Sequence, residues 1–301
     1  MKIGIVSCDK YKNKILEDIM LKDVFRSKKI EADIISWESD NTEEYDVFII
    51  RSIWGYQYRY NELMKWIKAT TQKNKIIFND YETIKSNIDK KIQYDLLSKN
   101  GIPVIPYRIV DDKNRNLTLE INKTIKTFQN EGYSEFVIKP SISESGKNTY
   151  FCKLNDKIKI GEISNEFENI IYNMPYEKII IQPFFNEIKN GEYSCIVLGG
   201  RIIRKMIRFP GLFTERKEIK KVDFIYDDEK KLVRKIQKCY NNAVYMRADY
   251  IRVNGKIQLM ELELVDPDLM TRKLKSKKEK NEFIEKFANE ILKGINNIWK
   301  K

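Results

Sequence analysis

The feature that most constrains this chain is a pair of apolar segments, 246–251 and 259–264, that carry acidic residues where strands usually place apolar ones. They flank an Asn-Gly pair at 254–255, and such a pair between alternating apolar residues predicts a β-hairpin. The register of the hairpin decides where its acids point. A two-residue turn would place Asp249 and Glu261 on opposite faces of the sheet, whereas a three-residue loop would place them opposite each other on one face.

The three-residue loop, which would pair Val253 with Ile257, also brings Glu263 onto the face of Asp249 and Glu261. Three carboxylates on one sheet face repel each other unless cations lie between them. Oxygen ligands of this kind suit Mg²⁺ or the similar Mn²⁺. The alternative is a solvated strand face with lysine and arginine partners, and for a single hairpin taken alone this is the more common arrangement.

The composition excludes several classes of active site. The 301 residues include no histidine, so the chain cannot form a Ser-His-Asp triad, a Cys-His dyad or a histidine-ligated metal site. Its four cysteines are scattered without a Cys-x-x-Cys pair, which argues against structural zinc and against a disulfide framework. Acid–base chemistry must therefore use carboxylates, lysines, tyrosines or groups of the substrate itself.

The net charge of +12 permits a polyanion such as nucleic acid as a partner. The basic residues are, however, spread along the chain, their densest cluster (271–280) is expected to be a solvated loop, and no nucleic-acid-binding motif is present. Nucleic acid is therefore a minor alternative. No apolar run is long enough to span a bilayer, and the first residues are predicted to form a strand rather than a signal peptide, so a cytoplasmic protein is expected.

The first part of the chain alternates strand and helix patterns. Its strands are predicted at 2–7, 32–37, 46–52 and 75–79. Such α/β alternation predicts a small parallel sheet with helices on its faces. Ligands of such sheets gather at the carboxyl ends of the strands, which makes the segments 7–9 and 51–56 candidates for a binding site.

The rest of the chain has an α+β pattern without internal repeats. A helix is predicted from Ser86 to Ser98, with Ser86 as its N-cap and with Ile88, Ile92 and Leu96 on its inner face. Strand and helix patterns follow in turn, then the acidic hairpin, and an amphipathic helix ends the chain. A domain boundary is expected near the helix at 86–98.

Two lysines and one loop precede the hairpin. Lys139 ends the apolar run 136–138, so its ammonium group is expected to point into a cleft, and Lys90 lies on the helix before 101–103. The loop 141–147 is rich in short hydroxyl side chains, suited to closing over phosphates with backbone N–H groups, although it is not a Walker A loop. Taken singly, a lysine that reaches solvent and an ordinary hairpin connection are the favoured explanations.

In this order and spacing, the features resemble the ATP-grasp superfamily of D-alanine–D-alanine ligase and glutathione synthetase, over about 81–267. The matching segments are 89–90 followed by 101–103, 137–141, 180–184, 191–192, 247–249 and 259–263. The resemblance implies an ATP-grasp fold preceded by a small parallel-sheet domain. Its expected parts are an N-terminal substrate-side domain (1–85), a central subdomain with a phosphate lid (86–185) and a C-terminal subdomain with a metal site (186–301).

The resemblance also implies roles for individual residues. ATP would bind at Lys90, Lys139, Ser143, Ser145, Gln182, Pro183, Phe184 and Glu192. Mg²⁺ or Mn²⁺ would bind at Asp249, Glu261 and Glu263. The catalytic residues, which would stabilise the reacting phosphoryl group, are Arg247, Lys139 and Arg208. Without the resemblance, residues 182–184 would be interpreted as ordinary sheet residues. For Glu192, an acidic residue in a surface turn is as good an interpretation as a contact with ATP.

Two departures from the superfamily bear on the substrate. The last metal ligand is commonly Asn where this chain has Glu263, and the run Glu-Leu-Glu-Leu-Val-Asp-Pro at 261–267 is similar to a branch that includes the ATP-grasp cyclase of cycloserine biosynthesis. The segment 51–56 also resembles the corresponding segment of that branch. The segment 208–216, in contrast, differs from the arginine-bearing stretch that the branch has after the β-hairpin. Substrate contacts are predicted at Arg51, Trp54, Tyr56 and Arg59. The two arginines could hold a carboxylate through a bidentate pair or could be salt-bridged loop residues.

The resemblance implies an ATP-dependent ligase that activates a carboxylate as an acylphosphate for attack by an amine, with an amino acid or a small peptide as substrate. One alternative is an intramolecular cyclase that uses the same activation. The other is a non-enzymatic protein that binds ATP or a polyanion. The expected partners are small-molecule carboxylates and amines, no membrane partner is expected, and a homodimer is left open.

Overall fold

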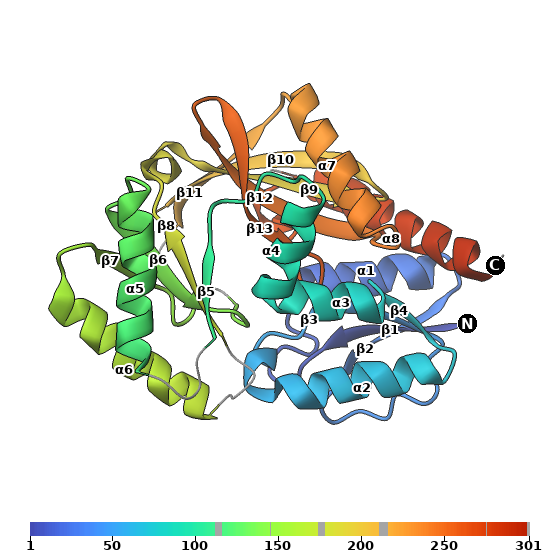
Figure 1. Cartoon of the computed structure of the whole chain (residues 1–301). Helices are drawn as coiled ribbons and strands as arrows, with labels where there is room; N and C mark the ends of the chain where they lie inside the picture. Colours follow the sequence, from blue (N-terminus) through green and yellow to red (C-terminus); the bar gives the residue numbers. More distant parts are fainter. Residues whose placement is uncertain (112–115, 145, 174–177, 211–215, 275, 300–301) are drawn as a thin grey trace.

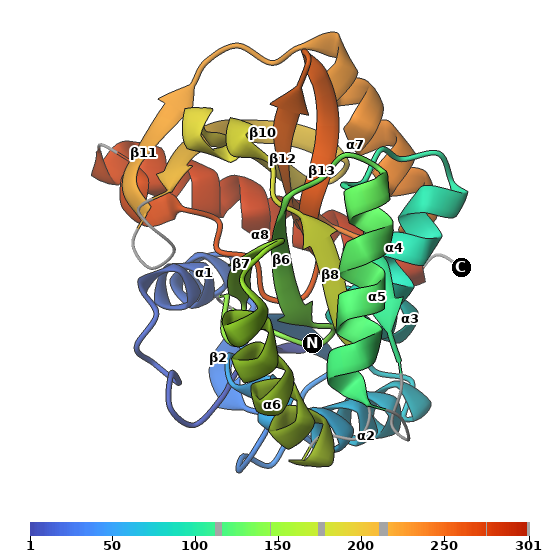
Figure 2. The same cartoon turned by 60° about the vertical axis from the view of Figure 1, so that its left-hand side comes forward.

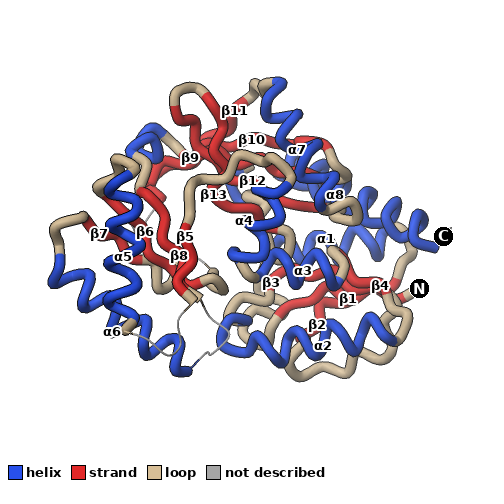
Figure 3. Tube along the Cα trace, in the orientation of Figure 1, coloured by secondary structure: helices blue, strands red, loops and turns tan. Residues whose placement is uncertain are grey.

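The computed structural model describes residues 1–111, 116–144, 146–173, 178–210, 216–274 and 276–299. The described strands form three sheets, and helices lie mostly on the outer sides of these sheets (Figure 1, Figure 3). Within the described residues, none of the helices combines the length and the apolar composition needed to traverse a bilayer.

The N-terminal sheet is parallel and has the order β2-β1-β3-β4. Its strands are β1 (Lys2–Ser7), β2 (Glu31–Ser36), β3 (Val47–Ser52) and β4 (Ile76–Phe78). Helices α1 (Leu16–Ser27) and α8 (Lys277–Trp299) pack on one face, and α2 (Tyr60–Gln72) and α3 (Tyr81–Ile88) on the other. The predicted parallel sheet is confirmed, with strand bounds within one residue of the prediction.

The predicted helix over 86–98 is wrong at its start. Two helices share this stretch, α3 and α4 (Lys90–Lys99), and Ser86 lies inside α3 rather than at a cap. Asp89 separates the helices because its backbone is extended and its carboxylate accepts a hydrogen bond from the amide two residues later, as an N-cap does. The break turns a different face of α4 inward and leaves Ile92 exposed. The residues that α4 buries are Lys90, Gln93, Tyr94 and Leu97.

The central sheet is antiparallel and has the order β5-β8-β6-β7. Its strands are β5 (Arg108–Val110), β6 (Glu135–Pro140), β7 (Tyr150–Lys153) and β8 (Ile179–Pro183). Helices α5 (Leu117–Asn130) and α6 (Lys157–Asn173) cover its outer face, as Figure 2 shows. The other face of this sheet carries Lys139 and Gln182.

The C-terminal sheet is antiparallel and has the order β11-β10-β9-β12-β13. Its strands are β9 (Glu192–Leu198), β10 (Arg201–Pro210), β11 (Arg216–Val222), β12 (Tyr245–Val253) and β13 (Lys256–Glu263). Helix α7 (Asp227–Cys239) packs on one face and α8 on part of the other. Three short 3₁₀ helices complete the described elements: η1 (Tyr56–Arg59), η2 (Asn186–Asn190) and η3 (Thr271–Lys273). The domain bounds 1–85, 86–185 and 186–301 stay predictions.

The turn of the acidic hairpin differs from the three-residue loop that would align its acids. Asn254 and Gly255 form a two-residue turn, with positive φ angles of 50° and 76°, and Val253 pairs with Lys256. If the pairing continued unchanged along both strands, Asp249 would face the opposite side of the sheet from the acids of β13.

A β-bulge at Met260 corrects this register. The pairing shifts by one residue between Leu259 and Glu261, so that Glu261 lies directly opposite Asp249. The hydroxyl of Tyr94 on α4 donates a hydrogen bond of 2.8 Å to the carbonyl of Met260, which satisfies a backbone group at the bulge. The predicted alignment of the two acids is therefore confirmed, but a bulge rather than the turn produces it.

Candidate active site

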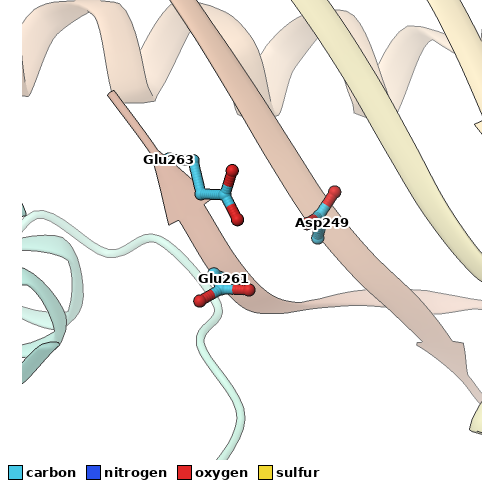
Figure 4. Close-up of side chains that lie close together, drawn as sticks. All are labelled: Asp249, Glu261 and Glu263. Carbon is cyan, nitrogen blue, oxygen red and sulfur yellow. The ribbon is translucent and has the colours of Figure 1, made fainter. Parts of the chain in front are cut away.

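Three carboxylates lie together on one face of the β12–β13 hairpin. Asp249 is completely buried, Glu261 and Glu263 are partly exposed, and one oxygen of each lies within 4.8 Å of the others. Figure 4 shows the three side chains close together, Glu261 and Glu263 on one strand and Asp249 on the neighbouring strand. A set of donors made only of carboxylate oxygens is the kind that Mg²⁺ and Mn²⁺ prefer, so these residues could hold such an ion.

Two buried arginines neutralise Asp249. Arg247, two residues earlier on β12, places its Nε 3.0–3.1 Å from both carboxylate oxygens, and Arg208 from β10 places Nη2 2.7 Å from Oδ2. Arg247 also lies 2.5 Å from Glu263. Burial opposes ionisation of Asp249, but the charges of Arg208 and Arg247 outweigh it and lower the pKa of this carboxyl.

For Glu261 and Glu263, burial and neighbouring charges also act on the pKa in opposite directions, with different outcomes. Burial raises the pKa of Glu261, but the charges of Lys90 and Lys139 outweigh that effect and lower it. For Glu263 burial dominates, with help from the neighbouring carboxylates and against Arg247, and raises its pKa to about 8. Glu263 is therefore the acid of the cluster whose negative charge its neighbours compensate least, and a divalent cation would stabilise that charge.

Two lysines from other elements approach the carboxylates. Lys90 begins α4, and its Nζ donates to the carbonyl of Ser143 at 2.6 Å and lies 3.8 Å from Glu261. Lys139 comes from β6, and its Nζ donates to the hydroxyl of Tyr94 at 3.2 Å. Burial lowers the pKa of Lys139, although the charge of Glu261 opposes the shift.

Strand alternation places Lys139 on the face of the central sheet opposite to α5 and α6. Its neighbour Ile138 points to the opposite face, where it joins the core under α5 and α6. Lys139 pairs with Ile180 of β8, and Gln182 two residues further along β8 pairs with Val137 and therefore shares the face of Lys139. Gln182 is buried on that face, so the predicted nucleotide residues Lys139 and Gln182 lie on the same side of the central sheet.

The remaining predicted nucleotide residues extend from this point. Pro183 ends β8 and is buried, and Phe184 packs edge-on against Phe151 with ring centroids 5.1 Å apart. Glu192 begins β9 and forms an ion pair with Arg208, which links it to the acidic cluster. Ser143 is buried in the loop after β6, whereas Ser145 falls outside the described residues.

The two predicted substrate arginines are already engaged in ion pairs. Arg51 is buried, lies 3.1 Å from Glu17 and 3.4 Å from Asp18, and donates to the carbonyl of Pro267 at 3.1 Å. Arg59 forms its pairs on the surface, with the carboxylates of Glu38 and Glu62. The salt-bridged arrangement that the sequence left open therefore describes both side chains, and their contact with a substrate stays a prediction.

The two predicted aromatic residues lie in different surroundings. Trp54 lines a cavity of about 230 Å³ together with Arg51 and Asp268. Tyr56 is buried, and burial with the nearby charges of Asp266 and Glu144 raises the pKa of its hydroxyl. Tyr56 thus lies beside the carboxylates, while Trp54 faces the neighbouring cavity.

Two acids near the cluster were not predicted from the sequence. Burial and the charge of Glu144 raise the pKa of Asp266 to about 7. One oxygen of each side chain, Oε2 of Glu144 and Oδ2 of Asp266, is buried without a hydrogen-bond partner among the described residues. The spacing of Asp266, three residues after Glu263, was a signal for it; no local pattern marked Glu144.

Comparisons with known proteins identify similar folds. Residues 3–79 match the model of the N-terminal domain of D-cycloserine synthetase DcsG, and among the curated proteins none matches the sequence. The crystal structure of D-cycloserine synthetase DcsG aligns with a TM-score of 0.78 at 18% identity, covering 96% of this chain and 98% of that one.

Two further solved structures have a similar fold. D-alanine–D-alanine ligase from Bacillus anthracis complexed with ATP aligns with a TM-score of 0.69 at 14% identity, covering 100% of this chain and 98% of that one. The RimK domain protein ATP-grasp from Sphaerobacter thermophilus gives 0.68 at 10% identity, with coverages of 96% and 98%. The chain thus has the ATP-grasp fold, as its sequence motifs predicted.

Proposed function

We propose that this chain with the ATP-grasp fold is an ATP-dependent, ADP-forming ligase. It would activate a carboxylate as an acylphosphate for attack by an amine of an amino acid or a small peptide. The observation that carries the proposal is the convergence of Asp249, Glu261 and Glu263, within 4.8 Å of one another, on the side approached by Lys90 and Lys139. Negative charge and lysines from separate elements are what the triphosphate and its metal require.

The phosphoryl transfer would rest mainly on positioning and charge neutralisation. Asp249, Glu261 and Glu263 would hold Mg²⁺ or Mn²⁺, which supplies charge compensation for the phosphate oxygens. Lys90 from α4 and Lys139 from β6 would contact the phosphates from the side of the central sheet. Since both lysines are buried or nearly so, their charges act through a medium of low dielectric and are worth more than in water.

The reaction would have two steps, formation of the acylphosphate and transfer of the acyl group to the amine. A carboxylate oxygen of the substrate attacks the γ-phosphorus of ATP, and ADP leaves. The amine then attacks the acyl carbon, phosphate leaves, and the proton of the amine passes to phosphate or solvent. Arg247 and Arg208 are held beside the carboxylate cluster and would stabilise the charge that develops on the oxygens in both steps.

The base and sugar of ATP would lie along β8 and the start of β9. Gln182, Pro183 and Phe184 follow one another at the end of β8, and a hinge of this kind offers backbone groups and an apolar wall to adenine. Glu192 would accept a hydrogen bond from ribose, in exchange for part of its ion pair with Arg208.

A second candidate function is intramolecular cyclisation with the same activation step. The observation that favours it is the match of residues 3–79 to the N-terminal domain of D-cycloserine synthetase DcsG, because this part of the chain carries Arg51, Trp54, Tyr56 and Arg59. In that case the amine and the carboxylate belong to one molecule, and the mass of the product distinguishes ring closure from ligation.

The test is ADP release with Mg²⁺ and ATP, screened over single amino acids, pairs of amino acids and dipeptides. Substrate-dependent ADP release that is lost in Lys139→Ala supports the proposal, and the product mass then separates ligase from cyclase. ADP release that is equal in wild type and Lys139→Ala would reject it, and nucleotide binding without turnover over the whole screen would favour a non-enzymatic protein. Cytoplasmic location and a homodimer stay predictions.

A further inference from the structure

The loop between β6 and β7 packs against the N-terminal domain. Ile142, which is 2% exposed, belongs to a buried apolar cluster that is otherwise made mainly of the N-terminal sheet and its helices. In that cluster it joins Ile53 and Tyr56, which follow β3, and Val265, which follows β13. The first part of the predicted phosphate lid, at Ile142, is therefore packed into the substrate-side domain.

Glu144 adds a polar tie two residues later. Its carboxylate Oε1 accepts a hydrogen bond of 2.9 Å from the amide of Gly55, and only 8% of its side chain is exposed. Gly55 has a φ of 103°, in the left-handed region, and immediately precedes η1, so its amide is turned away from strand pairing and toward the lid. A hydrogen bond from an amide to a partly desolvated carboxylate is among the stronger kinds.

The opposite side of the same loop is tied to the phosphate end of the site. The amide of Lys90 donates to the carbonyl of Ser141 at 2.9 Å, and Lys90 Nζ donates to the carbonyl of Ser143 at 2.6 Å. Ser143 and Glu144 are consecutive residues. One therefore contacts a lysine expected to bind phosphate, and the other contacts the backbone between Trp54 and Tyr56.

We propose that Glu144 is a positioning residue that fastens the lid segment 141–144 to the substrate-side loop 53–58, so that binding of nucleotide and ordering of the substrate-side loop favour each other. The fastening itself rests on the contacts above, and only its role in turnover rests on the proposed function. Because such coupling is reciprocal, a nucleotide under the lid must stabilise the loop at Gly55 by the same factor as an ordered loop strengthens nucleotide binding. Transfer of the phosphoryl group would then be favoured when both loops are in place.

Hydrogen exchange at the Gly55 amide measures this fastening directly, with the full chain, Mg²⁺ and a non-hydrolysable ATP analogue. In wild type the analogue is expected to slow exchange at Gly55 by about fivefold or more, within the usual range of coupling between sites. In Glu144→Ala the amide is expected to exchange about tenfold faster without nucleotide and to lose most of its response to it, since the acceptor is gone.

Two matched variants separate this role from general destabilisation. Glu144→Gln keeps an acceptor oxygen of the same reach and is expected to restore most of the protection at Gly55. Glu43→Ala removes an exposed acid elsewhere in the same domain, one that pairs only with Lys73 among the described contacts, and is expected to leave Gly55 unchanged.

The proposal is overturned if Gly55 exchanges equally in wild type and Glu144→Ala, or if the ATP analogue leaves the wild-type amide unaffected. The second measurement needs no variant, so it decides the matter even if Glu144→Ala does not fold. Failure to find any ligase activity would reject the proposed function while leaving the exchange result intact. If activity is found, Glu144→Ala is expected to raise the KM for ATP several-fold and to release ADP in excess of product.

Discussion

The two faces of β12 bury charged groups in opposite ways. On the face toward α7, Glu229 is completely buried and is contacted by Lys205 at 2.6 Å, by Arg252 at 3.0 Å and by the hydroxyl of Tyr250. Burial raises the pKa of Glu229, but its hydrogen bonds, first that from Lys205, outweigh burial and lower it. On the opposite face Asp249 of β12 lies beside Glu261 and Glu263 of β13, and for Glu263 burial wins and raises the pKa to about 8.

This difference distinguishes a structural cluster from a candidate site. Both faces contain buried acids and strong ion pairs, so burial of charge by itself marks neither. Around Glu229 two cations surround one anion, and nothing further is needed to satisfy it. Around Asp249, Glu261 and Glu263 the arginines and lysines compensate two of the acids, but the pKa of Glu263 stays raised, and a strongly shifted carboxyl within a cluster of charged groups is typical of functional sites.

The largest expected effect is that of a substitution at Asp249 on ADP release. Asp249→Asn keeps the shape of the side chain but removes the charge that the metal and both arginines share, so Mg²⁺-dependent ADP release should fall about 10³-fold, or about 4 kcal/mol in barrier height. The thermal midpoint should fall as well, because the buried Arg208 and Arg247 lose an anion that they share and keep only Glu192 and Glu263. Steady-state kinetics and a thermal melt of the same preparation check both parts. Normal turnover in this variant would break the comparison.

The matching change on the α7 face should affect stability and spare the chemistry. Glu229→Gln leaves the buried Lys205 without its anion, whereas Arg252 keeps Asp228, and the change should cost about 3 kcal/mol, or roughly 10 °C in the thermal midpoint. The KM for ATP of the folded fraction should stay within about twofold of wild type. A change in the KM for ATP as large as that of a variant in the carboxylate cluster would mean that the two faces of β12 are functionally linked.

How much of the site could be predicted from sequence depends on how local each signal is. Asp249, Glu261 and Glu263 stand out because acids interrupt apolar strands, and Lys139 stands out because a charge ends an apolar run. The alignment of the acids was expected for the wrong reason. A bulge at Met260 sets it, and the hydroxyl of Tyr94 that supports the bulge comes from a helix about 165 residues away in sequence.

The parts that were missed depend on contacts between distant segments. Glu144 is an ordinary polar residue within its own loop and gains its meaning only from the amide of Gly55, which the fold brings to it. The break between α3 and α4 is local, but helix continuity from Ser86 and a cap at Asp89 are both compatible with the sequence. Packing of the N-terminal cluster decides between them, since Ile84 and Ile88 are buried there while Ile92 is not.

A smaller effect should distinguish the two faces through pH. A carboxyl whose folded pKa is raised, like that of Glu263 at about 8, binds more protons in the folded than in the unfolded chain between about pH 4.5 and 8. The stability of the metal-free protein should therefore fall as the pH rises through this window. Glu263→Gln should flatten that decline and raise the midpoint at pH 8 by roughly 2–4 °C.

Thermal melts with EDTA over pH 5–9 measure the decline, and Mg²⁺ added at pH 8 should reverse it in wild type but much less in Glu263→Gln. Asp266, with a pKa raised to about 7, contributes in the same direction and remains in the variant, so a weaker slope is expected rather than none. A wild-type protein whose stability rises over this window would mean that the cluster is already compensated, as the Glu229 face is.

The smallest expected effect belongs to a third kind of ion pair, at the surface. Arg59 lies over the ring of Trp37 and pairs with Glu38 and Glu62 while 40% of its side chain is exposed. Solvent screens such pairs, so Arg59→Ala should change stability by about 1 kcal/mol or less. If the pairs describe the whole role of Arg59, substrate KM should change less than about twofold. A tenfold rise in substrate KM with unchanged KM for ATP would instead show that Arg59 leaves its partners to bind the substrate carboxylate. In that case, ion pairs formed in the unliganded protein would not distinguish structural from functional residues on this part of the surface.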